Sequence, residues 1–210
     1  LFYGFMTWLV RQLEGQKRIY FLSRDGHLPY QLYRLLAEHR VDLPEPVYLY
    51  ASRRAFQIPN ALNMEQQEAL ELFTAYNPAL GQRLTLGEVL DNLRLERREY
   101  AHLLAEYGFA DYGDEIRNEQ DRRRAQQLLK AIYPAITDRL QTEKELLLEY
   151  LRENGFDGQD EIHVMDVGWR ASTQKALKDI TGKRVCGYYF GTAENVYPDI
   201  AADTKGYAFH

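Results

Sequence analysis

The chain has 210 residues, 45% hydrophobic and 27% charged, with 26 Lys and Arg against 31 Asp and Glu. This length and apolar share are typical of one large globular domain, or of one domain that carries an insertion. The formal net charge of -5 argues against a nucleic-acid binder, because such proteins concentrate a basic excess on one face. No apolar run approaches the ~20 residues that cross a bilayer, so we expect no membrane span.

One cysteine, Cys186, excludes a disulfide framework and a cysteine-based zinc site, and it fits a reducing compartment such as the cytoplasm. Position 1 is Leu rather than an initiator Met, and the chain stops at Phe209-His210. We therefore expect a piece of a longer protein with additional domains, in which a segment outside this piece could hold part of the site.

The first predicted element is a helix, because apolar residues recur at helical spacing from Phe2 to Leu13. The run 18–22 is short, apolar and rich in β-formers, which is typical of a strand buried on both faces of a parallel sheet. A helix over 28–39 and a second strand over 47–51 follow. Together these segments predict a βαβ unit.

Helix formers dominate from about 56 to 158, where no strand pattern occurs. Helices are predicted over 65–76, 93–107 and 119–154, the last with a break at Pro134. Thr85 and Glu88 have the spacing of a capping box and predict the start of one more helix.

The strand pattern returns over 161–165 and 184–190, with a helix over 172–180 between the two strands. We therefore predict an α/β fold with a small parallel, Rossmann-like sheet and a large all-helical insertion after its second strand. The sheet domain would comprise 1–55 and 159–210, and the insertion 56–158.

Polar side chains follow the predicted strands where each one ends. In an open parallel sheet, the carboxyl ends of the strands and the helix N-termini converge at one edge, where ligands bind. Serines, arginines and acids at such an edge indicate an anion or phosphate site. The candidates are Ser23, Arg24, Asp25 and Gly26 after the first strand, Ser52, Arg53 and Arg54 after the second, and Asp166, Gly168, Trp169 and Ser172 after the third.

Each candidate has a structural alternative. Asp25 and Ser172 could cap the helices that follow them, and the arginines could be partners in surface ion pairs. Trp169 could pack in the core instead of stacking on a sugar or a base. Asp166 is the strongest candidate, because an acid that closes a buried apolar strand is costly unless it is paired or ligates something.

Three short motifs, by their order and spacing, resemble those of the haloacid-dehalogenase-like (HAD-like) predicted hydrolases. They are FLSRDG at 21–26, LYASRRA at 49–55 and MDVGW at 165–169 with Ser172 and Gln174. The group that they resemble is associated with polysaccharide and glycosyltransferase genes. The resemblance covers both ends of the chain and hardly touches its helical middle.

The resemblance implies a phosphatase-class hydrolase with a helical cap, Mg²⁺ as cofactor, and a sugar phosphate or nucleotide sugar as substrate. The family's first motif is Asp-x-Asp-Gly-Thr, whose first Asp is nucleophile and magnesium ligand; Ser23 stands there in this chain. Asp25 matches the second Asp, the general acid/base, and Asp166 resembles the magnesium-holding acid. Ser52 matches the residue that holds the phosphoryl group. The family's phosphate-binding lysine has no clear match, although Lys144 is a candidate by position.

Ser23 departs from the family pattern, because a hydroxyl is a poor substitute for a carboxylate as nucleophile and as ligand of a hard cation. A Ser23–His27–Asp166 triad would be one way to activate it, and Arg53 or Arg54 could do the work of the lysine. Two functions stay open: magnesium-dependent phosphoryl transfer or phosphate-ester hydrolysis, and a catalytically inactive binding or scaffold module attached to a glycosyltransferase or an intact HAD domain. The insertion could also be mainly a partner-binding surface.

Overall fold

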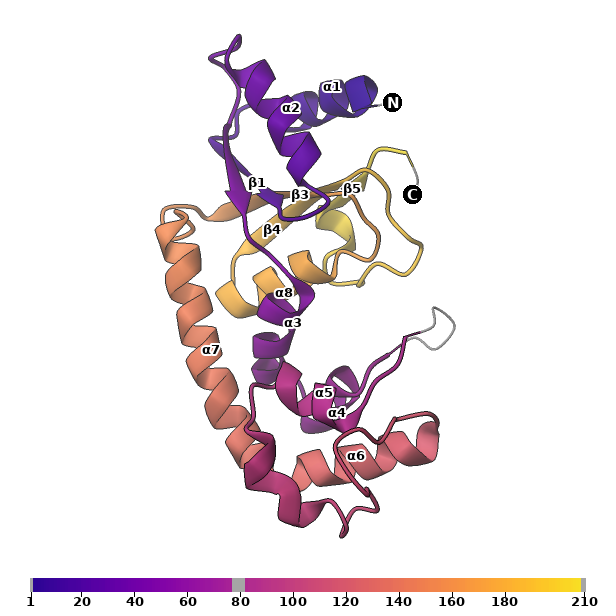
Figure 1. The fold of residues 1–210 in the computed structure, drawn as a ribbon. Helices are drawn as coiled ribbons and strands as arrows, with labels where there is room; N and C mark the ends of the chain where they lie inside the picture. The colour runs from indigo at the N-terminus through magenta and orange to yellow at the C-terminus, as the bar shows by residue number, and fades with distance from the viewer. Residues whose placement is uncertain (1, 77–81, 209–210) are drawn as a thin grey trace. The chain divides into compact units, whose positions relative to one another are not determined.

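The computed structural model describes residues 2–76 and 82–208 (Figure 1), and the side chain of Arg53, one of the expected ligand-binding groups, lies outside the described part. The chain divides into two compact units. The first unit comprises 1–57 and 147–210, and the second comprises 58–146. Each unit has its own apolar core and is described by itself.

Within the described residues, the first unit contains a five-stranded sheet of order β2-β1-β3-β4-β5 in which every pairing is parallel. The chain is therefore α/β with a parallel sheet, as predicted, and the architecture is consistent with a Rossmann-like class. The strands are β1 (Arg18–Leu22), β2 (Glu45–Leu49), β3 (Glu161–Asp166), β4 (Arg184–Tyr189) and β5 (Thr204–Gly206).

The two outer strands differ from the inner ones. β2 contains Pro46, which pairs with Ile19 of β1 and has no N–H to donate. β5 is three residues long with Lys205 at its centre, and its lack of an apolar run explains why the sequence did not predict it. Inner strands are apolar because both of their faces are buried.

Helices cover the two faces of this sheet. Side chains of a strand alternate between faces, so Phe21 of β1 packs in one core and Tyr20 in the other. One face packs against α1 (Phe2–Gln12) and α2 (His27–Ala37). The other packs against α8 (Ser172–Thr181), the start of α3 (Arg53–Asn60) and the end of α7 (Tyr133–Glu153).

The second unit is helical in its described part. Its elements are η1 (Ala61–Asn63), α4 (Gln66–Phe73), α5 (Leu86–Asn92), η3 (Arg97–Leu103), α6 (Glu119–Ala131), the end of α3 and the first part of α7. Thr85 and Glu88 form the predicted capping box of α5. The predicted break is also present, because α6 ends at Ala131 and Pro134 lies in the first turn of α7.

The helix predicted over 93–107 is wrong. Arg94 takes a left-handed conformation with φ of 55°, and the N–H of Leu95 donates to the carbonyl oxygen of Leu90 at 3.0 Å. This closes α5 in the manner of a C-terminal capping turn. The chain then forms only the short η3, from Arg97 to Leu103.

Residues of α7 belong to both units. Leu147 and Leu151 are buried with Tyr20 and Phe156 in the core of the first unit. The second unit therefore ends at 146, before the expected end of the insertion at 158, because the last two turns of the helix supply side chains to the sheet domain. None of the helices in the described ranges combines the length and apolar character needed to cross a membrane.

Candidate functional site

A cavity of about 460 Å³ lies at the carboxyl edge of the sheet in the first unit. Segments that follow β1, β3 and β4 line it together with the first turn of α8. This volume is in the range of small-molecule sites. Seven of the predicted residues line the cavity: Ser23, Arg24, Asp25, Asp166, Gly168, Trp169 and Ser172.

Three other predicted residues do not line the cavity. Gly26 allows the tight turn after β1, since a Cβ there would lie 2.2 Å from the carbonyl oxygen of Leu22. The Ser52 hydroxyl accepts a hydrogen bond from the N–H of Ala55 at 3.1 Å, which makes it a cap for the start of α3. Arg54, in the same helix, is half-buried.

The Ser23 hydroxyl is occupied by the backbone of Ala51. It donates its proton to the carbonyl oxygen of Ala51 at 2.6 Å and accepts from the N–H of the same residue at 2.8 Å. The N–H of Ser23 also donates to the carbonyl oxygen of Leu49 at 2.9 Å. Ser23 thus ties the end of β1 to the end of β2, and its proton is directed at a carbonyl group rather than at a base.

The structure does not assemble the Ser23–His27–Asp166 triad. His27 is not among the residues that line the cavity. Its ring instead packs edge-on against Tyr48, with the ring centroids 5.4 Å apart. Since a triad needs a hydrogen bond from the hydroxyl to the imidazole, Ser23 has no activating partner of this kind.

Two carboxylates face the cavity. Asp25 is exposed and makes no hydrogen bond or ion pair with any residue that the structure describes. Asp166 is half-buried at the end of β3, and its Oδ1 accepts from the N–H of Val167 at 2.8 Å. Mg²⁺ is typically held by one or two carboxylates plus waters and ligand phosphates, so this donor set fits the ion.

The cap alternatives for Asp25 and Ser172 are not realised. The N-cap of α2 is Gly26 and that of α8 is Ala171, and neither helix start receives a side-chain cap. Ser172 and Thr173, the first two residues of α8, line the cavity. The first N–H groups of a helix carry partial positive charge and bind anions.

Two arginines line the cavity: Arg24, and Arg170, which belongs to the polar stretch after the third predicted strand. The guanidinium of Arg170 lies over the ring of Tyr197, 5.9 Å from the centroid. Sequence reasoning missed Asn195 and Tyr197 in the lining; their only signal was that polar residues follow the fourth strand.

The loops after β3 and β4 approach each other closely. A Cβ on Gly168 would lie 2.6 Å from the carbonyl oxygen of Gly191, so only glycine fits there. The N–H of Gly191 donates to Val167 at 3.1 Å, and the N–H of Ala193 donates to Trp169 at 2.9 Å. These bonds hold Trp169 at the cavity with 54% of its surface exposed, which excludes the core interpretation.

Gln174 anchors α8, whose start lines the cavity. This buried side chain donates to the carbonyl oxygens of Val185 at 2.8 Å and Asp203 at 3.1 Å. Its own oxygen accepts from the hydroxyls of Tyr189 and Thr204 at 3.0 and 3.1 Å. The helix is thereby fixed to β4 and β5.

Lys144, the lysine considered by position, belongs to the second unit. Its Nζ donates to Asn63 Oδ1 at 3.1 Å within that unit. Positive charge in the cavity lining therefore comes from Arg24 and Arg170.

In comparisons with known proteins, no family model matches this chain, and no curated protein matches its sequence significantly.

Proposed function

We propose that this chain binds a phosphorylated small molecule together with Mg²⁺ at the carboxyl edge of the sheet, and that it forms no phospho-enzyme. The observation that carries the proposal is the shared cavity, which is lined by two carboxylates, two arginines and an uncapped helix start. The resemblance of the three motifs to hydrolases associated with glycosyltransferases directs the proposal to a sugar phosphate or a nucleotide sugar.

Each group has a role in this proposal. Arg24 and Arg170 would bind phosphate oxygens, which the guanidinium fork matches bidentately. The N–H groups of Ser172 and Thr173 would donate to the same anion. Trp169 offers an exposed ring face to a sugar or a base.

Asp25 and Asp166 would hold Mg²⁺, which supplies positive charge for the phosphate when it is bound. Asp166 keeps one oxygen on the N–H of Val167, which orients the carboxylate. Asp25 lies on the turn after β1, and Asp166 ends β3. These two strands are paired neighbours in the sheet.

Covalent catalysis through position 23 is not part of the proposal, because the Ser23 proton is donated to Ala51. Phosphate-ester hydrolysis by water is the second candidate function. The observation that favours it is the Asp25 carboxylate, which faces the cavity without a partner among the described residues and could accept a proton from water. Otherwise the chain would serve as the binding module of a larger protein.

Calorimetric titration tests the binding proposal. We expect glucose 1-phosphate and UDP-glucose to bind in the presence of Mg²⁺, with weaker binding without it, and glucose not to bind. Arg170→Gln and Asp166→Asn should each weaken binding at least about tenfold, or about 1.4 kcal/mol. The matched controls Arg11→Gln and Asp160→Asn, exposed residues of the same unit outside the cavity lining, should bind as the parent does.

The same samples separate the two functions. Phosphate release from these esters that is lost in Asp25→Asn, at ester and Mg²⁺ concentrations that saturate the variant, would establish hydrolysis. Binding without release would establish the binding module. Equal affinity in parent, Arg170→Gln and Asp166→Asn would contradict the proposal altogether.

A further inference from the structure

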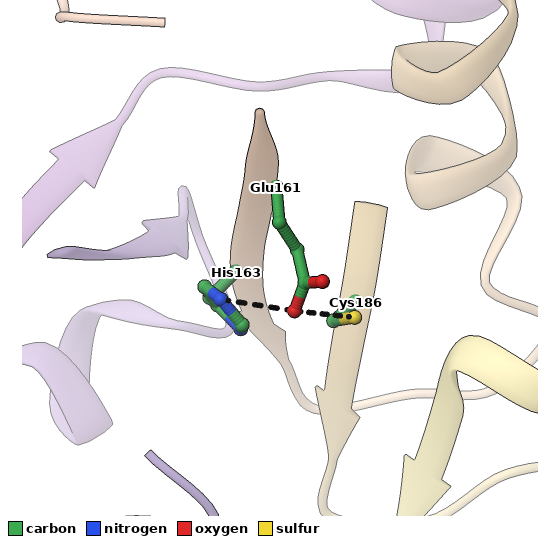
Figure 2. A group of neighbouring side chains, drawn as sticks. All are labelled: Glu161, His163 and Cys186. Atoms are coloured by element: carbon green, nitrogen blue, oxygen red, sulfur yellow. Dashed lines mark hydrogen bonds and ion pairs between the residues drawn. The ribbon is translucent and has the colours of Figure 1, made fainter. Parts of the chain in front are cut away.

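Three side chains with metal-ligating atoms converge near the start of β3, whereas Asp166 of the cavity lining ends that strand. Figure 2 shows these three side chains. Glu161 is the first residue of β3 and His163 is two residues later, so both face the same side of the sheet. Cys186 of β4 pairs with His163 in the parallel register and joins them on that side. The cluster is therefore a product of strand pairing rather than of a sequence motif, and the count of one cysteine, which spoke against a cysteine-based zinc site, could not reveal it.

The three donor atoms have the spacing of a metal coordination sphere. Figure 2 shows the Glu161 carboxylate between the other two side chains: Oε1 lies 3.3 Å from His163 Nε2 and 3.3 Å from Cys186 Sγ. All three atoms lie within 4.8 Å of one another. A tetrahedral zinc ion with bonds of about 2.0–2.3 Å has its ligand atoms roughly 3.3–3.8 Å apart.

His163 supplies an independent observation. Its side chain is 3% exposed, and Nε2 has no hydrogen-bond partner among the described residues despite its closeness to Glu161. The other ring nitrogen, Nδ1, lies 3.0 Å from the Tyr188 hydroxyl. Metal-ligating histidines are oriented in this way, by a hydrogen bond at the nitrogen that does not bind the metal. A buried Nε2 without a partner is thus aimed at a carboxylate oxygen and a sulfur.

The charged neighbours leave this face of Glu161 available. Arg184 pairs with the other carboxylate oxygen, Oε2, at 2.8 Å, and with Asp203 Oδ1 at 2.6 Å. Asp203 Oδ1 also lies 3.9 Å from Cys186 Sγ. The Glu161 side chain is 33% exposed, which provides an entry path to the two buried ligands.

We propose that Glu161, His163 and Cys186 bind a Zn²⁺ ion. A set of one thiolate, one imidazole and one carboxylate selects zinc over Mg²⁺ or Ca²⁺, which prefer oxygen ligands alone. Three protein ligands leave one position of the tetrahedral ion for water. The ion would tie β3 to β4.

Binding requires loss of the thiol proton. Without metal, the Cys186 thiol donates to Glu161 Oε1; burial, with the Glu161 carboxylate adding to it, raises its pKa to about 12. Zinc would replace this proton, so the S–H bond breaks, an S–Zn bond forms, and the proton passes to the buffer.

Cobalt substitution tests the site in the whole chain. Cys186 is the only cysteine, so a thiolate-to-cobalt charge-transfer band on addition of Co²⁺ reports this residue alone. We expect the band to saturate at one ion per chain and to disappear when Zn²⁺ displaces Co²⁺. We also expect Zn²⁺ to raise the Tm, because it binds the folded state.

Variants distinguish the site from surface binding. Cys186→Ser should abolish the band, and His163→Gln should weaken Co²⁺ and Zn²⁺ binding at least about 100-fold. Tyr188→Phe, which acts only through the His163 ring, should weaken it about 10-fold. The matched control His39→Gln, an exposed histidine outside the cluster, should bind as the parent does.

If Cys186→Ser fails to fold by circular dichroism, His163→Gln carries the test, because it leaves the thiol in place and should still weaken binding of the metal. Absence of a charge-transfer band in the folded parent would overturn the proposal. So would zinc binding of parental strength in folded His163→Gln, because the ion would then be held by other histidines or carboxylates. The proposed function at the cavity does not depend on either result.

Discussion

Arg24 has a backbone conformation that is unfavourable for any residue with a side chain. Its φ is 70°, in the left-handed region that costs a non-glycine L-residue about 1–2 kcal/mol. It lies between Ser23, fixed to Ala51, and Gly26, where a Cβ would meet Leu22. The side chain is exposed and lines the cavity. An outlier that places an arginine at a cavity suggests a role for the side chain in binding.

The substitution Arg24→Gly separates these two effects. We expect it to raise the free energy of unfolding by up to about 1 kcal/mol, because glycine removes the left-handed cost but has more entropy to lose on folding. Affinity for glucose 1-phosphate should fall about 10-fold. Urea unfolding and calorimetry measure the two quantities.

Arg94→Gly is the matched control for this prediction. Arg94 is also exposed, with φ of 55°, but it belongs to the second unit and lies outside the cavity lining. The substitution Arg94→Gly should raise the free energy of unfolding by a similar amount and leave the affinity for glucose 1-phosphate unchanged. Unaltered affinity in Arg24→Gly would remove Arg24 from the proposed site.

Ser23 gives a second prediction at the same scale. Ser23→Ala should lower the free energy of unfolding by about 1–3 kcal/mol, because the N–H and carbonyl of Ala51 lose their partner. Ligand affinity, measured by calorimetry on the folded variant, should change less than about 3-fold, since a lost tie between strands leaves the arginines in place. Lost phosphate release at unchanged stability would instead mean that the hydroxyl is catalytic.

The sequence predicted which residues line the cavity better than it predicted the interactions that they make. Position at the ends of strands was enough to collect Ser23, Asp25 and Asp166 at one edge. It could not show that the Ser23 hydroxyl is taken up by Ala51, because that contact joins residues 28 positions apart. The roles of the acids and arginines in binding stay predictions.

Among the elements, the strands with continuous apolar runs could be predicted from the sequence. The short edge strand β5 and the turn at Arg94 could not. β1, β3 and β4 follow from burial on both faces, whereas β5 is a strand by virtue of its pairing with β4. The residues expected to form a helix over 93–107 carry a helical spacing of apolar side chains because Tyr100, Leu103 and Leu104 pack on the core of the second unit. The turn at Arg94 prevents that helix.

Asp121 at the start of α6 gives a prediction on pH. Its Oδ2 accepts from the N–H of Arg117 at 3.1 Å, and its carboxylate pairs with Arg124. Burial acts to raise the pKa of Asp121, but the bonds from Arg124, Arg117 and Asn118 together bring it below the ordinary value of 3.8. A lowered folded pKa means that the carboxylate stabilises the fold above pH 3.8, and that this is lost as pH falls through the folded value.

We therefore expect Asp121→Asn to lower the free energy of unfolding by about 1–3 kcal/mol at pH 7. The difference from the parent should shrink as the pH falls below about 4, as followed by urea unfolding between pH 7 and 3. Asp160→Asn, an exposed acid that forms no ion pair with the residues that the structure describes, is the control. A difference that grows toward low pH would contradict the assigned ionisation.

At the scale of the molecule, the two units have separate cores. Leu128 is buried among side chains of the second unit, and Leu177 of α8 is buried in the first. The sequence predicted this division from the change in pattern after the second strand. It placed the end of the insertion too late because a helix has the same sequence signature whether its side chains enter one core or the other.

Truncation in each core should therefore have different consequences. Leu128→Ala and Leu177→Ala should each cost about 2–5 kcal/mol of local stability. Hydrogen exchange should accelerate within 58–146 for Leu128→Ala, and the affinity for glucose 1-phosphate should stay at the parental value. Leu177→Ala should accelerate exchange around the sheet and lower the affinity for glucose 1-phosphate, because the start of α8 lines the cavity. Equal acceleration throughout the chain in both variants would show that the units unfold together.

The outer strands of the sheet have a consequence for the handling of the protein. A free strand edge is a template onto which another chain can add by backbone pairing. Pro46 interrupts the donor row of β2, and β5 offers three residues with a lysine at their centre. Concentrated preparations should accordingly resist fibrillar self-assembly, and replacement of Pro46 by valine should be the change that promotes it.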